Sequence, residues 1–218
     1  YGIDPVIARI IRNRDITGDE AIEEYLNGTL ADIPSWKLLK DIDKAVEIIS
    51  GKIDAGTKMR IIGDYDIDGV TATYILLKGF KRLGANVDTY IPDRVEDGYG
   101  IHDHLIKKAM EDGIDTIVTC DNGISASSQI TYAKELGMTV VVTDHHEVPF
   151  TDTEEGRTYI LPPADAIINP KQADCTYPNK NICGAVVAMK LVFALYEKYR
   201  LPEEEKEDFL EPAAIATV

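Results

Sequence analysis

From residue 58 onward, short apolar runs alternate with amphipathic stretches along the chain. The apolar runs have the length and composition of buried strands, and they cover residues 59–63, 87–91, 115–120, 138–143 and 165–169. Three stretches between them carry apolar residues at helical spacing and close on glycine, namely VTATYILLKGFKRLG, HDHLIKKAMEDG and SSQITYAKELG. Strand–helix–strand units of these lengths predict right-handed crossovers between parallel strands. We therefore expect an α/β fold of three layers (α/β/α), with helices on both faces of a five-stranded parallel sheet.

Residues 1–56 lack this alternation and show helical periodicity instead. Apolar residues recur at helical spacing in GDEAIEEYLNG and in LLKDIDKAVEIISGKIDAG. The pattern predicts an N-terminal helical lead-in over residues 1–56 and an α/β domain over residues 57–218. The stretch GAVVAMKLVFALYEKYR, residues 184–200, predicts a largely buried helix, and the sequence then stops within a further apolar helix. We therefore expect the domain to be truncated at its C-terminal end.

The composition is that of an ordinary globular protein. Hydrophobic residues make up 44% of the 218, and no apolar run approaches the roughly 20 residues that span a bilayer, so we expect no membrane segment. The net charge of −15 argues mildly against a broad basic face for nucleic acid, although bound divalent cations would reverse the local field. The cysteines Cys120, Cys175 and Cys183 form no C-x-x-C motif, which favours reduced thiols and a cytoplasmic protein over a disulfide or zinc site.

Polar side chains follow three of the predicted strands at the point where each strand ends. The acids and histidines concerned are Asp64, Asp66 and Asp68 after the first strand, Asp121 after the third, and Asp144, His145 and His146 after the fourth. Because the carboxyl ends of parallel strands share one edge of the sheet, we expect these side chains to converge. Carboxylates packed so closely repel one another unless cations lie between them. Oxygen and imidazole ligands without a thiolate favour two Mn²⁺ or Mg²⁺ ions.

A pair of divalent cations about 3.5–4 Å apart is a recurring device for hydrolysing phosphoesters. Gly69 and Gly123 directly follow acidic or amide residues, where glycine permits tight turns and close approach of the backbone to a substrate. Taken separately, each cluster also fits a structural role, as a helix cap, a loop histidine pair or a turn. The coincidence of all three clusters at one predicted edge favours a phosphoesterase site.

Three motifs carry a family resemblance. GDYDIDGVTAT, CDNGIS and VTDHHEV resemble the first three motifs of the DHH phosphoesterase superfamily, which is named for its Asp-His-His triplet. Within it, IPDRVEDGYGIH, NICGAVVAMKL and the lead-in LADIPSWKLLKDIDKAVEII resemble the N-terminal part of RecJ-type single-strand-DNA-specific exonucleases. Oligoribonuclease-like and pyrophosphatase-like relatives carry His-x-x-x-Asp-x-Asp, whereas Ile62 stands at the histidine position here. RecJ-type enzymes use a preceding aspartate instead, which matches Asp64.

The resemblance implies roles for the clustered residues. It makes Asp66, Asp68, Asp121 and His145 metal ligands, with Asp64 a ligand or an outer acid. It also makes Asp121 the bridge between the two metals. Asp144 would orient the histidines, and His146 would contact the scissile phosphate or protonate the leaving oxygen.

Substrate contacts are implied for Arg94, Gly123 and Gly184. For Arg94, a surface salt bridge with Glu96 or Asp97 fits the sequence about as well as a phosphate contact. His102 and His104 lie two residues apart at a predicted helix start, so they do not share a face, and we expect capping or solvated residues there and not ligands.

The function implied by the resemblance is a metal-dependent 5′→3′ exonuclease acting on single-stranded DNA in recombination and repair. Repair or replication proteins are the implied partner class, and the oligomeric state is left open. The alternatives are a phosphodiesterase for short oligonucleotides or cyclic dinucleotides, and a scaffold without activity, against which the intact ligand positions argue. The family carries a further metal-binding aspartate after a helix resembling AAIATV, and this sequence ends at Val218. We therefore expect an incomplete second metal site, weak second-metal binding and little or no processive activity.

Overall fold

The computed structural model describes residues 1–95, 97–98, 100–153 and 156–218. These residues form two compact units, Tyr1–Ser35 and Trp36–Val218. The first unit contains α1 (Pro5–Arg12), α2 (Asp19–Asn27) and the short 3-10 helix η1 (Leu30–Asp32). Helix α1 begins after Asp4, whose side chain accepts a hydrogen bond from the Val6 N–H at 2.7 Å.

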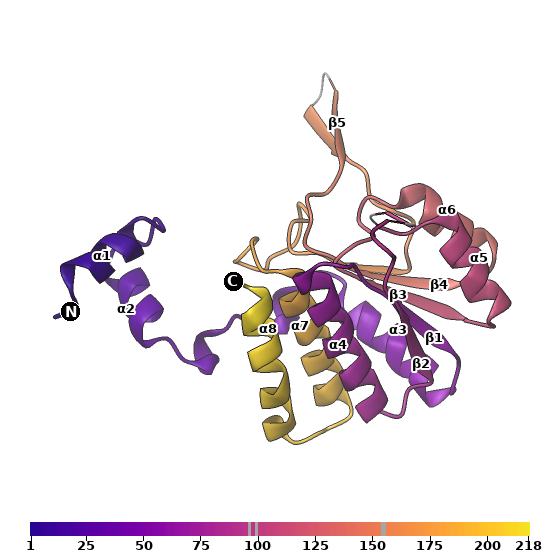
Figure 1. The fold of residues 1–218 in the computed structure, drawn as a ribbon, viewed down its shortest axis with the longest axis horizontal. Helices are drawn as coiled ribbons and strands as arrows, with labels where there is room; N and C mark the ends of the chain where they lie inside the picture. The colour runs from indigo at the N-terminus through magenta and orange to yellow at the C-terminus, as the bar shows by residue number, and fades with distance from the viewer. Residues whose placement is uncertain (96, 99, 154–155) are drawn as a thin grey trace. The chain divides into compact units, whose positions relative to one another are not determined.

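The second unit contains the predicted five-stranded parallel sheet (Figure 1). Its strands are β1 (Met59–Ile62), β2 (Val87–Tyr90), β3 (Thr116–Cys120), β4 (Thr139–Thr143) and β7 (Ala166–Ile168). They lie in the order β2-β1-β3-β4-β7, and every neighbouring pair is parallel. All five predicted strands are thereby confirmed, each within a residue or two of its expected ends.

Helices cover both faces of this sheet, as predicted. They are η2 (Trp36–Leu38), α3 (Ile42–Asp54), α4 (Ile67–Arg82), α5 (Asp103–Glu111), α6 (Ser127–Glu135), α7 (Gly184–Lys198), η3 (Glu203–Phe209) and α8 (Leu210–Ala216). Because side chains alternate along a strand, the sheet has two apolar faces. One face, including Ile61 and Val118, packs with α3, α4, α7 and α8. The other, including Ile117 and Val140, packs with α5 and α6 (Figure 1).

The strand order reverses between β1 and β3. From β1 the chain crosses through α4 to β2 on one side, and from β3 it crosses through α6 to β4 on the other side. The loops that leave β1 and β3 therefore diverge, and in open α/β sheets this reversal opens a crevice beyond the carboxyl ends of the strands. The fold thus places the loops that follow β1 and β3 at a typical ligand-binding position.

Two features of the fold were not predicted. The chain after β4 forms an antiparallel hairpin of β5 (Phe150–Thr153) and β6 (Gly156–Tyr159) before it reaches β7. In addition, α3 packs against α7 and β7 in the second unit, although the sequence assigned it to the lead-in. The compact units therefore divide between Ser35 and Trp36, while the family-based division after residue 56 stays a prediction.

The structure also bears on membrane-spanning segments and on the state of the cysteines. Among the described residues, the helices are all too short or too polar to cross a membrane. The three cysteines are free, and Cys120 is fully buried in the core. Burial raises the pKa of the Cys120 thiol to about 12, so this residue is an inert core side chain.

Helix α7 is largely buried, as expected, yet its core face includes a lysine. Lys190 is 2% exposed, and its Nζ lies 5.1 Å from the centre of the Tyr177 ring. Burial lowers the pKa of Lys190 to about 8, because the charged form loses its hydration. Folding is therefore coupled to the release of a proton from this side chain above that pH.

We expect the stability of the chain to depend on pH through Lys190. Between the folded pKa of about 8 and the ordinary value of 10.5, the unfolded state binds more protons, so stability rises with pH. The free energy of unfolding of the parent, minus that of Lys190→Met, should rise by up to about 1.4 kcal/mol per pH unit in this window. Urea unfolding of both proteins from pH 7 to pH 10 measures this difference. Parallel pH profiles would contradict the coupling.

Candidate metal centre

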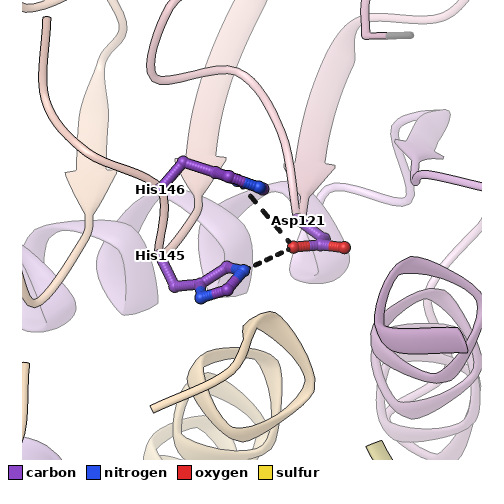
Figure 2. Close-up of side chains that lie close together, drawn as sticks. All are labelled: Asp121, His145 and His146. Atoms are coloured by element: carbon purple, nitrogen blue, oxygen red, sulfur yellow. Dashed lines mark ion pairs between the residues drawn. The ribbon is translucent and has the colours of Figure 1, made fainter. Parts of the chain in front are cut away.

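The loops after β1, β3 and β4 bring the predicted acids and histidines together at one edge of the sheet. Two groups of side chains offer ligand atoms that lie within 4.8 Å of one another. One group consists of Asp64, Asp66 and Asp121, and the other of Asp121, His145 and His146. Figure 2 shows how the second group converges on the Asp121 carboxylate. Asp121 belongs to both groups, which is the arrangement expected of a bridging ligand.

Asp121 is held in an unusual and buried position. Its backbone φ is 60°, a left-handed conformation that costs a non-glycine residue on the order of 1 kcal/mol. The side chain is 2% exposed, and its Oδ1 lies 3.0 Å from His145 Nε2 and 4.0 Å from His146 Nδ1. Neither contact gives Oδ1 an aligned hydrogen bond. Burial raises the pKa of Asp121 to about 6, against the lowering influence of His145.

The acids after β1 complete the first group. Asp64 is 2% exposed, its Oδ1 is buried without a hydrogen-bond partner, and burial raises the pKa of its carboxyl group. Asp66 is exposed and caps α4, with Oδ1 accepting from the Gly69 N–H at 2.9 Å. Buried carboxylate oxygens without partners are costly unless a cation meets them. The donor set therefore fits a hard divalent cation.

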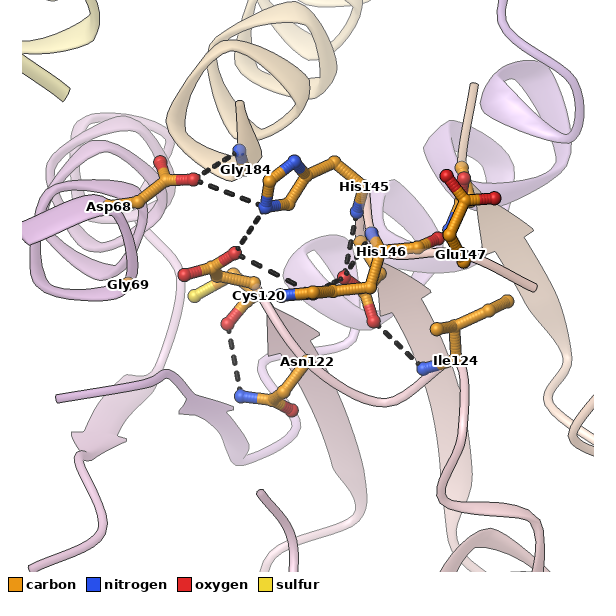
Figure 3. Close-up of polar contacts among 12 residues, drawn as sticks. Asp68, Gly69, Cys120, Asn122, Ile124, His145, His146, Glu147 and Gly184 are labelled. Carbon is orange, nitrogen blue, oxygen red and sulfur yellow. Dashed lines mark hydrogen bonds and ion pairs between the residues drawn. The ribbon is translucent and has the colours of Figure 1, made fainter. Parts of the chain in front are cut away.

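Asp68 makes a different set of contacts. Its two carboxylate oxygens accept from the backbone N–H groups of Gly184 and Ala185, each at 2.7 Å, at the beginning of α7. Figure 3 shows the contact with Gly184. These two bonds satisfy donors that a helix N-terminus leaves unpaired, and the helix dipole favours a negative charge there. Asp68 Oδ2 also lies 3.4 Å from His145 Nε2. The predicted role of Asp68 as a ligand stays a prediction, and its contacts with α7 are an additional finding.

Asp144 is buried behind the histidines and bonds to their loop. Its Oδ1 lies 2.7 Å from His146 Nδ1 and accepts from the His145 N–H, while Oδ2 accepts from the Ile124 N–H (Figure 3). Burial alone would raise the pKa of Asp144, but the pairing with His146 and the backbone donors keep that pKa below its usual value. The same pairing raises the pKa of His146. These contacts are those of an acid that orients His146, although that role stays a prediction.

Close packing at two glycines holds the acidic loops together. A Cβ added at Gly184 would lie 2.8 Å from Asp121 Oδ1 and 2.9 Å from Asp121 Cβ. A Cβ at Gly69 would lie 2.5 Å from the Cβ of Asp64. Neither position tolerates a side chain without movement of a candidate ligand. For Gly184, which the resemblance assigns to substrate contact, the observed neighbours are therefore carboxylates.

Gly123 and Arg94 are the other residues assigned to substrate contact. Gly123 has a φ of +107°, which only glycine adopts readily, and it forms the turn after Asn122. The Arg94 guanidinium lies over the Tyr65 ring, with Cζ 5.0 Å from the ring centre. The alternative partner Asp97 instead lies 2.7 Å from His104 Nε2. The other alternative partner of Arg94, Glu96, lies outside the described residues.

The remaining histidines lie away from the candidate ligands. His102 is the residue before the first turn of α5, and its ring stacks on that of His104 with centres 5.8 Å apart. Neither belongs to a group of candidate metal ligands among the described residues. The expectation that the two side chains share no face was wrong, because their rings stack on each other, while their exclusion from the ligand set stays a prediction.

Two neighbours of the ligands were assigned no role from the sequence. Asn122 is 1% exposed, and its Nδ2 donates to the Ile62 carbonyl at 3.3 Å and to the Cys120 carbonyl at 3.1 Å, which ties the ends of β1 and β3 together. Tyr65 supports Arg94, as described above. The signals were present, since Asn122 lies in the DNG turn and Tyr65 lies between two of the acids. A pocket of about 280 Å³ lies beside His146 and includes Asn122 and Gly123 in its lining.

Comparison with known proteins places the chain among relatives of a single kind. Residues 58–217 match the DHH family, N-terminal domain. The chain is 38% identical over 194 residues to the single-stranded-DNA-specific exonuclease RecJ of Escherichia coli (strain K12), covering 88% of this chain and 31% of that protein. It is 38% identical over 216 residues to the protein of the same name from Bacillus subtilis (strain 168), covering 99% of this chain and 26% of that protein.

A solved structure is also similar. The crystal structure of exonuclease RecJ bound to manganese matches with a TM-score of 0.69 and 33% identity, covering 82% of this chain and 43% of that chain. The chain therefore spans about a third or less of the length of the curated relatives described above.

We expect Gly184→Ala to weaken metal binding, because the added methyl group would displace the Asp121 carboxylate. Calorimetric titration with Mn²⁺ should show affinity reduced at least tenfold, with the circular dichroism spectrum unchanged. Gly51→Ala is the matched control, since a Cβ at Gly51 on α3 meets nothing within 4 Å, and alanine favours a helix by up to about 1 kcal/mol. Parent-like Mn²⁺ affinity in Gly184→Ala would show that this contact does not position Asp121.

Proposed function

The chain belongs to the DHH family, and we propose that it is the metal-dependent catalytic core of a 5′→3′ exonuclease that hydrolyses single-stranded DNA. The two relatives named above are single-stranded-DNA-specific exonucleases, which supports this substrate class. The polarity of cleavage and a place in recombination and repair rest on the resemblance of the motifs. The position of Ile62 supports a nuclease over a phosphodiesterase for short oligonucleotides or cyclic dinucleotides, because no histidine stands there.

One observation carries the proposal, namely that two groups of candidate ligands share the buried Asp121 carboxylate. The buried oxygens of Asp64 and Asp121 that accept no aligned hydrogen bond fit cations and would be unfavourable without them. A solved relative bound to manganese supports Mn²⁺ as one of the metals, with Mg²⁺ the other candidate. When bound, two such cations activate a water for in-line attack and neutralise charge on the phosphodiester.

The two metal positions should differ in their affinity for a divalent cation. The group formed by Asp64, Asp66 and Asp121 offers three carboxylates, whereas on the histidine side Asp121 and His145 offer one carboxylate and one imidazole, with His146 kept for proton transfer. Attraction for a divalent cation rises with the negative charge of its ligands. We propose that the histidine side is the weaker position.

Residues around the metals would handle the substrate. Pairing with Asp144 holds the His146 ring in one orientation and raises its pKa, which suits a group that donates a proton to the leaving oxygen. The Arg94 guanidinium stacks over Tyr65, which lies between two of the acids after β1. In that position the planar guanidinium would contact a phosphate of the substrate. Gly123 lets the backbone approach the substrate closely.

We also propose a cytoplasmic location, which is consistent with the three free cysteines. Repair or replication proteins are the class of protein partner that we propose.

Hydrolysis assays with Mn²⁺ test this function directly. We expect slow, metal-dependent release of mononucleotides from 5′-phosphorylated single strands, little cleavage of duplex DNA, and little turnover of cyclic dinucleotides. Asp121→Asn should reduce the rate on single strands at least a hundredfold, because the amide lacks the charge that two cations would share.

The matched control is Asp43→Asn, which removes an exposed carboxylate in the first turn of α3 and should leave the rate unchanged. A preference for cyclic dinucleotides over single strands would favour the phosphodiesterase. Absence of metal-dependent hydrolysis of every substrate would contradict a catalytic core.

A further inference from the structure

The hairpin of β5 and β6 has two chemically distinct faces. Phe150 pairs with Tyr159 across the strands, and Asp152 pairs with Arg157, so these four side chains share one face. The other face carries only threonines and a glycine, namely Thr151, Thr153, Gly156 and Thr158. All large side chains of the described strands β5 and β6 therefore lie on one side of the hairpin.

The rings and the guanidinium on that face form a continuous row. The Phe150 and Tyr159 rings meet edge to face with centres 6.1 Å apart. The Arg157 guanidinium lies over the Phe150 ring at 4.2 Å, and its Nε is 3.5 Å from Asp152 Oδ1. The row thus runs from Tyr159 through Phe150 to Arg157. Such contacts stabilise a hairpin that would otherwise be marginal in water.

This row is exposed, and the hairpin projects from the layered part of the molecule (Figure 1). Phe150 is 41% exposed and Tyr159 is 45% exposed, and every described residue of β5 and β6 belongs to the exposed class. Aromatic side chains gathered on an exposed surface mark an interaction site more often than isolated ones do. The hairpin therefore presents an aromatic face with no role in the core of the fold.

The root of the hairpin is tied to the loop that carries the candidate ligands. Val148 is 3% exposed, and the Ile160 N–H donates to the Pro149 carbonyl at 2.7 Å, which closes the root. Phe150 follows His146 by four residues, so the two Cα atoms are at most roughly 14 Å apart. A DNA strand bound at the metal centre would need to extend only a few nucleotides further to reach the aromatic row.

We propose that Phe150, Arg157 and Tyr159 form a stacking platform for the bases of single-stranded DNA, a few nucleotides from the bond that is cleaved. The platform rests on the proposed function, because it needs a strand in the metal centre. Each exposed ring offers a surface to any base, which gives binding without sequence preference. The guanidinium stacks on Phe150 and pairs with Asp152 through Nε, so a phosphate would meet its terminal N–H groups.

The charge of the chain favours bases over the phosphate backbone as the main contact. A net charge of −15 opposes binding led by phosphates. Stacking on aromatic rings needs no positive field, so it lets an acidic chain hold a single strand. A platform of this kind also selects single strands, because the bases of a duplex are already stacked on one another.

Fluorescence anisotropy with a labelled 5′-phosphorylated oligonucleotide tests the platform, with Ca²⁺ as the divalent cation. Phe150→Ala/Tyr159→Ala should bind the oligonucleotide about tenfold more weakly than the parent. The same variant should bind an abasic oligonucleotide of equal length as well as the parent does. Thr151→Ala/Thr158→Ala, on the opposite face of the same hairpin, is the control and should bind like the parent. Phe150→Leu/Tyr159→Leu keeps apolar side chains without aromatic rings and should lose as much affinity as the alanine variant.

Three results of the DNA-binding measurements would overturn the platform. They are unchanged binding of the normal oligonucleotide by the alanine variant, equal losses on the normal and abasic oligonucleotides, and parent-like binding by the leucine variant. Self-association of the parent that disappears in the alanine variant, without an effect on DNA, would assign the face to a second copy and also overturn it. Mn²⁺-dependent hydrolysis of bis-(p-nitrophenyl) phosphate should be equal in all variants. If the parent and the variants all failed to hydrolyse this substrate, the result would count against the proposed function and not against the platform.

Discussion

The structure depends on how several carboxylates are kept close together at the edge of one sheet. Parallel strands that end at the same edge bring Asp64 and Asp121 into a common space, and the reversal of strand order between β1 and β3 opens that space to ligands. Repulsion and burial oppose this convergence, as the raised pKa values of both acids reflect. Divalent cations bound between these carboxylates would offset the repulsion and make this edge of the sheet a metal-binding site. The same cluster of negative charge is therefore a cost to folding and the basis of the proposed chemistry.

The surrounding elements hold this cluster in place through different means. The N-terminus of α7 holds Asp68 through two backbone N–H groups, and Gly184 at the same helix end lets α7 pack directly against Asp121. Asp144 fixes the loop after β4 and pairs with His146. Most of these constraints come from backbone groups and from glycine, which cannot move aside as flexible side chains can. The cluster is thereby organised before any metal arrives, which is favourable for a catalytic site.

Much of this arrangement could be predicted from the sequence, because it follows from periodicity and chain order. The strands are short and mostly apolar, with Asp88 in β2 and Arg60 in β1 as the charged exceptions, and the carboxyl ends of parallel strands necessarily share an edge. The contact of Asp68 with Gly184 and Ala185 could not be predicted, because it joins positions 116 and 117 residues apart. The hairpin was missed because FTDTEEGRTY has few apolar residues and no core face. The packing of α3 with the second unit was missed because helical periodicity shows an apolar face without showing what covers it.

Anomalous diffraction from crystals of the chain soaked in Mn²⁺ tests the central claim most directly. The account predicts two peaks about 3.5–4 Å apart, both within ligand distance of Asp121. The peak beside Asp64 and Asp66 should be more fully occupied than the peak beside His145 and His146. A single peak, or two peaks of which only one contacts Asp121, would contradict a metal centre built around a shared carboxylate.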